Sequence, residues 1–148
     1  MAFWHRLKKK LLKRYVLHAF FPATRPVALR WCGWEIGEDV YIADGLLIVE
    51  ELADRDNLRI GNRVSIAPRV TLVTSSHPNS SRIRPVAPVA SGPIVIEDDV
   101  WIGANVVILD GSIIRRGCVI GACSLVRGHL EEYGVYAGNP LVKLGERH

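Results

Sequence analysis

His77 is the residue of this chain best placed to move a proton. It lies in the segment Thr74-Ser75-Ser76-His77-Pro78, where the proline restricts the backbone directly after it. A free imidazole titrates at about pH 6.5, so at pH 7 it is neutral and available as a general base. A histidine in a polar loop is also often a plain solvated side chain. The residues alone leave both interpretations open.

The other chemistry-bearing residues form no obvious metal site. A catalytic zinc ion takes three protein ligands that converge, yet the five histidines are scattered, and none lies between Ile96 and Gly128. We therefore expect no metal. The acidic segment Glu50–Asn57 either bulges from a strand or lines a site.

A repeat of six residues in the sequence predicts the structural elements that must position these residues. An aliphatic residue returns with this period from residue 96 to 126, and the same phase appears over 36–48 and 60–72. A period of six fits neither a helix nor an antiparallel strand. It is typical of a parallel β-helix, in which three units close a triangular coil and stacked coils share an aliphatic column. The column of the later coils is Ile96, Ile102, Ile108, Ile114, Ile120 and Val126.

Two interruptions break this pattern. Between Ile48 and Ile60 the aliphatic position falls on Asp54, so a charged segment replaces a strand. Between Leu72 and Ile96 the pattern lapses in a Ser- and Pro-rich run. We predict one extruded loop over residues 73–95, and long ordered loops on rigid scaffolds commonly carry function.

The segment Asp98-Asp99-Val100-Trp101-Ile102-Gly103-Ala104-Asn105 and the ending Ala137-Gly138-Asn139-Pro140 resemble the left-handed β-helix acyltransferases. The likeness covers about residues 35–145 and is nearest to the maltose/galactoside O-acetyltransferases and their polysaccharide-modifying relatives. It implies an all-β fold, a left-handed parallel β-helix. It also implies a CoA-dependent O-acyltransferase that moves an acetyl group from acetyl-CoA to a hydroxyl of a sugar or glycan precursor, by direct attack on the thioester.

The resemblance also implies roles for individual residues. The His77-Pro78 segment matches the family's catalytic segment, so His77 is expected to be the general base. The family's acceptor-binding Asp falls within Asp54-Arg55-Asp56, so Asp54 and Asp56 are the expected substrate-binding residues. The alternative is that they form a solvated acidic turn. The position of the family's acceptor-binding Asn is occupied by Leu47. The expected CoA-binding residues, each of which could instead be a turn, packing or solvated residue, are Ala104, Ala122, Arg127, Lys143 and Trp101.

Residues 1–34 form a basic arm ahead of the β-helix domain 35–145. Eight of the 19 Lys and Arg residues lie before Glu35, the first acid, which leaves 11 cations against 15 acids in the rest. The positive charge is thus confined to the arm, and we expect no nucleic-acid partner. Apolar residues at helical spacing from Phe3 to Tyr15 predict a short amphipathic helix. Two interpretations stay open: the helix packs on its own domain or a neighbouring subunit, or residues 1–20 lie on an anionic membrane surface.

The composition suits one folded intracellular domain of 148 residues, 49% apolar and 23% charged. No apolar stretch approaches the roughly 18 residues that would span a bilayer. The three cysteines form no CxxC pair, and we expect them to be buried. We expect a cytoplasmic protein, with peripheral contact at the inner face of the membrane as the alternative.

The assembly and the function class complete these expectations. A β-helix of stacked triangular coils has the shape of a prism, and one such prism supplies only a single wall of a groove long enough for CoA. Relatives of this fold are trimers, so we expect a homotrimer with sites between subunits. Two other functions stay open: an acyltransferase of the same fold that acts on an amine or non-sugar acceptor, and a non-catalytic hexapeptide assembly subunit.

Overall fold

Each six-residue unit folds into one short strand followed by a corner, because its aliphatic residue points into the prism. The computed structural model describes residues 2–148. Its strands form three parallel sheets, one for each face of the prism. The first sheet holds β1 (Glu35–Ile36), β4 (Leu58–Ile60), β9 (Ile94–Ile96), β12 (Ile113–Ile114) and β15 (His129–Leu130). The second holds β2 (Tyr41–Ile42), β5 (Ser65–Ile66), β10 (Trp101–Ile102), β13 (Val119–Ile120) and β16 (Gly134–Ala137), with β17 (Val142–Glu146) antiparallel at its edge. The third holds β3 (Leu47–Val49), β6 (Thr71–Val73), β11 (Val107–Ile108) and β14 (Leu125–Val126).

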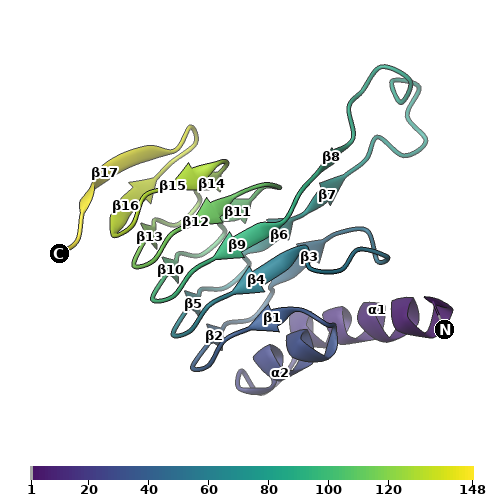
Figure 1. The fold of residues 1–148 in the computed structure, drawn as a ribbon, viewed down its shortest axis with the longest axis horizontal. Helices are drawn as coiled ribbons and strands as arrows, with labels where there is room; N and C mark the ends of the chain where they lie inside the picture. Colours follow the sequence, from purple (N-terminus) through teal and green to yellow (C-terminus); the bar gives the residue numbers. More distant parts are fainter. Residues whose placement is uncertain (1) are drawn as a thin grey trace.

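The core is formed by the aliphatic residues that the repeat predicts, but they stack in three columns, one for each sheet, and not in the single column expected. Ile66 pairs in parallel register with Ile102, and Ile102 with Ile120, so equivalent residues of successive coils stack directly. Figure 1 shows the strands β5, β10 and β13 that carry them side by side. Ile66 and Ile102 are fully buried. Mostly parallel sheets with two helices fit the left-handed β-helix that the resemblance implies.

Both interruptions of the repeat occur at the same corner of neighbouring coils. The chain leaves the third sheet after β3 and after β6, and each time it makes a detour before entering the first sheet at β4 and β9. The second detour is the segment predicted as a loop over 73–95. The loop is shorter than predicted, because Val73 belongs to β6 and residues 94 and 95 belong to β9. Its ends are also more regular than expected, because β7 (Ser75–Ser76) and β8 (Ala90–Ser91) pair as antiparallel strands. The segment between them projects away from the coils (Figure 1).

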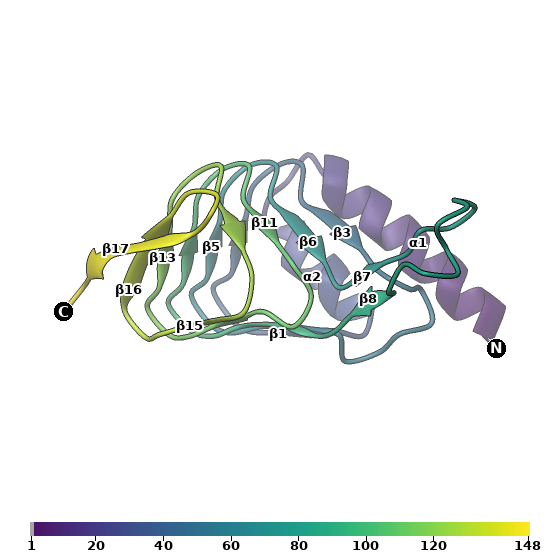
Figure 2. The same cartoon turned by 90° about the horizontal axis from the view of Figure 1, so that it is seen from above.

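Two helices, rather than the single predicted one, lie against the first coil (Figure 2). They are α1 (Ala2–His18) and α2 (Thr24–Trp31), and they pack on each other and on the strands of that coil. Arg25 of α2 is fully buried and donates a hydrogen bond to the Ile42 carbonyl at 2.7 Å. Met1 lies outside the described residues. The boundary between the basic arm, residues 1–34, and the β-helix domain, residues 35–145, stays a prediction.

The structure tests two further expectations: that the three cysteines are buried, and that no apolar segment is long enough to span a bilayer. Cys32 and Cys118 are buried, but Cys123 is exposed, so the expectation of three buried cysteines is wrong for Cys123. It occupies a corner with φ of 60°, where a short side chain points outward. Neither helix in residues 2–148 has the length and apolarity to cross a membrane.

Candidate active site

The shared corner brings His77 beside the acidic segment. Strands β3 and β6 pair in register, with Ile48 opposite Leu72 and Val49 opposite Val73. The ladder extends one step further, because the Thr74 amide donates to the Val49 carbonyl at 2.9 Å. The residues that follow the two strands therefore leave the prism side by side.

His77 contacts two side chains at this corner. Its Nε2 lies 3.0 Å from Oε1 of Glu51 and 2.8 Å from Oγ of Ser75. Ser75 is buried, whereas His77 and Glu51 are partly open to solvent. A carboxylate can only accept a hydrogen bond, so Nε2 carries the proton that faces Glu51. In the neutral ring the lone pair is then on Nδ1.

A cavity of about 420 Å³ adjoins the imidazole. Glu51 and His77 form part of its wall, and the segment between β7 and β8 contributes Asn79, Arg84 and Val89. Open access, a proton acceptor and a nearby carboxylate suit the deprotonation of a bound hydroxyl. The sequence pattern identified His77 but not Glu51, because their contact depends on which coils carry the two detours.

The neighbouring Glu50 is fixed from behind by α1. Its side chain is fully buried and accepts a 2.6 Å hydrogen bond from Nζ of Lys9, with Nζ of Lys13 at 3.2 Å. Asn57 donates to Glu50 and to Thr74, each at 3.1 Å. The helix thus anchors the backbone that carries Glu51.

The two aspartates expected to bind substrate lie farther along the same detour. The Asp54 carbonyl accepts a hydrogen bond from Lys9 at 2.9 Å, and its amide donates to the Glu51 carbonyl. Asp56 is exposed, with φ of 57°. Neither lines the cavity beside His77, where the carboxylate is that of Glu51. Their role in acceptor binding stays a prediction.

The expected donor positions stack on one another at a different corner. Ala104 follows β10 and Ala122 follows β13, and the parallel pairing of these strands places the two alanines in successive coils. The Cys123 amide donates to the Ala104 carbonyl at 2.8 Å. At Gly103 an added Cβ would lie 2.6 Å from the Ala122 nitrogen, so the close stacking requires glycine there. Trp101 is half-exposed on β10, on the outside of the prism.

The two cations expected to bind CoA, Arg127 and Lys143, differ in how freely they could contact a phosphate group. Arg127 is exposed directly after β14. Nζ of Lys143 lies 2.6 Å from carboxylate oxygens of Glu131 and Glu146, and these hydrogen bonds raise the pKa of the ammonium. A phosphate would have to compete with both carboxylates for Lys143, so Arg127 is the freer of the two.

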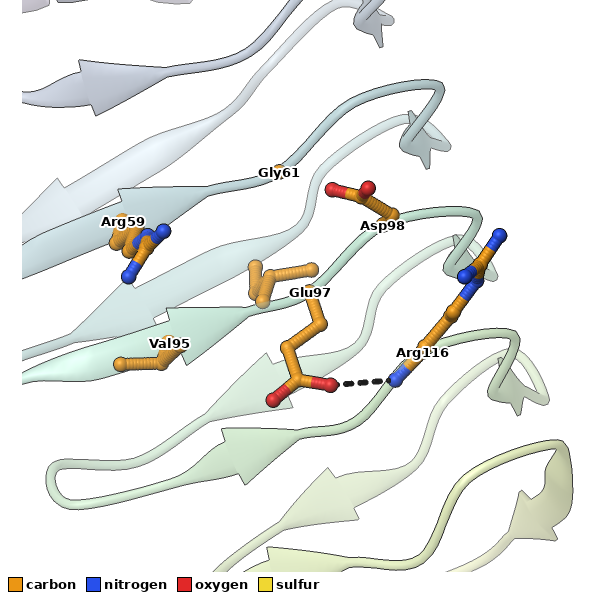
Figure 3. A pocket seen from close by; sticks show the side chains of 7 residues that line it. Arg59, Gly61, Val95, Glu97, Asp98 and Arg116 are labelled. Carbon is orange, nitrogen blue, oxygen red and sulfur yellow. Dashed lines mark hydrogen bonds between the residues drawn. The ribbon is translucent and has the colours of Figure 1, made fainter.

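Figure 3 shows a second surface pocket, whose lining does not include His77. It is formed at a corner of the first sheet, where Glu97 accepts a hydrogen bond from the Arg116 amide at 2.9 Å. Its Arg59 pairs with Glu35, and Asp98 accepts a hydrogen bond from the Asn62 amide. These contacts tie successive coils together. Over residues 2–148 no cluster of His, Cys, Asp and Glu suits a metal ion.

Comparisons with known proteins agree with this architecture. Residues 93–128 match the family model described as bacterial transferase hexapeptide (six repeats). The galactoside O-acetyltransferase of Lactococcus lactis subsp. lactis is 34% identical over 106 residues, covering 70% of this chain and 51% of the relative. That of Escherichia coli K12 is 39% identical over 105 residues, covering 71% and 50%. This chain therefore spans about half the length of the curated relatives it matches.

A solved structure extends the likeness to the whole fold. The hexapeptide-repeat-containing acetyltransferase of Vibrio cholerae O1 biovar eltor, complexed with acetyl coenzyme A, is 27% identical, with a TM-score of 0.70. The alignment covers 97% of this chain and 87% of that one. Fold and site together define a class: a parallel β-helix of hexapeptide units with a histidine at an open corner. The chain belongs to the hexapeptide-repeat acetyltransferase superfamily.

Proposed function

We propose that this protein is a CoA-dependent O-acetyltransferase that acts on a hydroxyl of a sugar or glycan precursor. The observation that carries the proposal is the His77–Glu51 pair, which stands beside an open cavity on a fold shared with acetyltransferases. A galactoside O-acetyltransferase among the relatives supports a sugar acceptor, and the acetyl-CoA complex of the Vibrio protein supports the donor.

In the proposed reaction the acceptor hydroxyl attacks the thioester carbonyl of acetyl-CoA directly. His77 takes the hydroxyl proton as the new C–O bond forms. A backbone amide holds the negative charge that develops on the carbonyl oxygen. The C–S bond then breaks, and CoA leaves as a thiolate that can recover the proton from His77. No acyl-enzyme forms.

Glu51 has a supporting part in this scheme. Its carboxylate faces the ring of His77, so it orients the imidazole and stabilises the imidazolium that exists after proton transfer. Ser75 contacts the same nitrogen from the buried side. Because both contacts use Nε2, the ring is held in place while Nδ1 keeps its lone pair.

The decisive test is His77→Ala in an assay of thiol release from acetyl-CoA with a panel of sugars and glycolipids. We expect acetyl transfer to fall by roughly 10²–10⁴-fold, the usual contribution of a general base. Acetyl-CoA affinity should stay unchanged. The matched control is His129→Ala, because His129 is exposed on β15, at a different place on the prism. Activity of His77→Ala within about threefold of the parent would remove His77 from the mechanism.

A further inference from the structure

The outward side of α1 is apolar, which is unusual for a helix at the surface of a domain. Phe3, Trp4 and Leu11 are 69%, 72% and 60% exposed, and Leu7 and Tyr15 are also exposed. The inward side instead carries Lys9, which is buried. The helix therefore turns Lys9 and Val16 toward the protein, and its aromatic residues together with Leu7 and Leu11 toward solvent.

Helix α2 and the preceding turn extend this surface. A groove of about 500 Å³ between the helices is lined by Leu11 and Tyr15 from α1 and by Val27 and Trp31 from α2. Trp31 is 62% exposed. The exposed large apolar side chains of α1, of α2 and of the turn that joins them, here called the α1–α2 face, are Phe3, Trp4, Leu7, Leu11, Tyr15, Phe20, Phe21, Val27 and Trp31. Contiguous exposed apolar patches of this kind mark interaction sites.

Positive charge flanks the apolar residues. At 100° per residue, Lys10 lies at one edge of the arc that runs from Phe3 to Tyr15 and Lys8 lies at the other edge, while Arg14 falls between Phe3 and Leu7 in the last turns of the helix. These three cations are exposed. No Asp or Glu occurs between residue 2 and residue 34. The face is therefore apolar at its centre and purely cationic at its edges.

We propose that the α1–α2 face docks this protein on an anionic phospholipid bilayer. Aromatic and aliphatic side chains would enter the boundary between headgroups and acyl chains, and Trp and Tyr favour this boundary. The flanking cations would contact anionic headgroups. A second copy packed through the same face fits less well, because two such faces would bring like charges together without an acid on either helix to pair with them. Contact with a different surface of a neighbouring copy is an outcome of the test.

The placement of the helices is compatible with this orientation. In both views α1 lies at the end of the molecule opposite the C-terminus, and the projecting segment between β7 and β8 extends toward the same end (Figures 1 and 2). Docking through α1 and α2 would thus leave the C-terminal coils away from the lipid. It would bring the end that carries His77 toward the bilayer.

Point substitutions test the proposal better than removal of the helix. Lys9 and Lys13 hold the buried Glu50, so deletion of residues 1–20 would expose a buried charge and disturb the corner of His77. The test variant is Trp4→Ser with Leu11→Ser. Its matched control is Val142→Ser with Leu144→Ser, two comparably exposed apolar residues on β17 at the other end of the prism.

The measurement is co-sedimentation of the full chain with vesicles of phosphatidylcholine alone or with about one third phosphatidylglycerol. We expect the parent and the β17 control to bind only the anionic vesicles, with binding lost in 0.5 M NaCl because salt screens the headgroup charge. The Trp4/Leu11 variant should bind at least about tenfold more weakly. Lys8→Glu with Lys10→Glu should lower binding by roughly fivefold or more per cation, whereas Arg115→Glu with Arg147→Glu, an equal change in net charge, should not.

Three outcomes would overturn the proposal. One is absence of parent binding to anionic vesicles at low salt, and another is equal loss of binding in the β17 control. The third combines two results: the parent binds no vesicles, and light scattering gives the Trp4/Leu11 variant a smaller mass than the parent. That combination would assign the α1–α2 face to contacts between copies of the chain. Vesicle binding needs no turnover, so its failure is distinguishable from failure of the proposed acetyltransferase activity.

Discussion

The contact between His77 and Glu51 gives the first prediction at the scale of single residues. Glu51→Gln keeps the size of the side chain but removes the charge that stabilises a protonated His77. We expect kcat to fall by about tenfold to a hundredfold, with the KM for acetyl-CoA unchanged. Glu51→Asp, which restores the charge on a shorter side chain, should recover part of the loss. Steady-state kinetics on all three proteins measure this.

Glu132→Gln is the control for that substitution, because Glu132 is exposed near the last coil. It should match the parent in kcat and in thermal stability. A Glu51→Gln protein with full kcat would show that the carboxylate has no part in proton transfer. A lowered melting temperature with unchanged kcat would make Glu51 a structural residue only.

The sequence predicted His77 but not its partner, and the reason is physical. His77 follows a strand and precedes a proline, so its position relative to the repeat can be read along the chain. The Glu51 contact depends on two detours that leave adjacent coils at one corner. Counting positions pointed instead to Asp54 and Asp56, which the detour carries away from the cavity.

At the scale of elements, α1 stabilises the first coil through a buried charge pair. Nζ of Lys9 contacts Glu50 at 2.6 Å and lies 4.6 Å from the centroid of the Trp34 ring. Removing one partner of a buried pair is strongly destabilising, because the remaining charge loses its nearest compensation. In the Lys9 variant Glu50 would keep only the longer contact with Lys13, at 3.2 Å. We expect Lys9→Met to lower the free energy of unfolding by about 3–5 kcal/mol, measured by urea denaturation.

Lys10→Met tests whether this effect depends on burial. Lys10 neighbours Lys9 but is exposed, so its substitution should change stability by less than about 0.5 kcal/mol. Equal effects of the two substitutions would contradict a role for the buried pair. The comparison holds helix propensity nearly constant, because both variants replace Lys with Met in the middle of α1.

The elements could be predicted as far as their period was visible. Most strands bury a single aliphatic residue and repeat in register, so the buried aliphatic positions followed from the sequence. Helix α2 could not be predicted from the sequence pattern, because it has only eight residues and contains Pro26. Proline is tolerated in the first helical turn, where its missing N–H costs little. The apolar spacing of α1 was visible, but the inward direction of Lys9 depends on the buried Glu50.

At the scale of the whole molecule, the two halves of the proposed site lie on different corners of the prism. His77 follows the sheet formed by β3, β6, β11 and β14, whereas Ala104 and Ala122 precede strands β11 and β14 of that sheet. One face of the prism thus separates the base from the donor positions. A second copy packed on this face would bring its own corner to His77. We therefore propose a homotrimer in which each site combines His77 of one subunit with the donor corner of the next.

Mixed trimers test this arrangement. His77→Ala removes the base, and Ala122→Trp should block the approach of the pantetheine arm, so each variant alone should be nearly inactive. If sites are shared between subunits, random assembly of the two variants leaves about a quarter of the sites with both parent residues, and about a quarter of the parent activity should return. If each site uses one chain only, no mixed trimer can combine them. Co-expression of two differently tagged His77→Ala chains is the control, and a stable, active monomer by light scattering would refute the trimer itself.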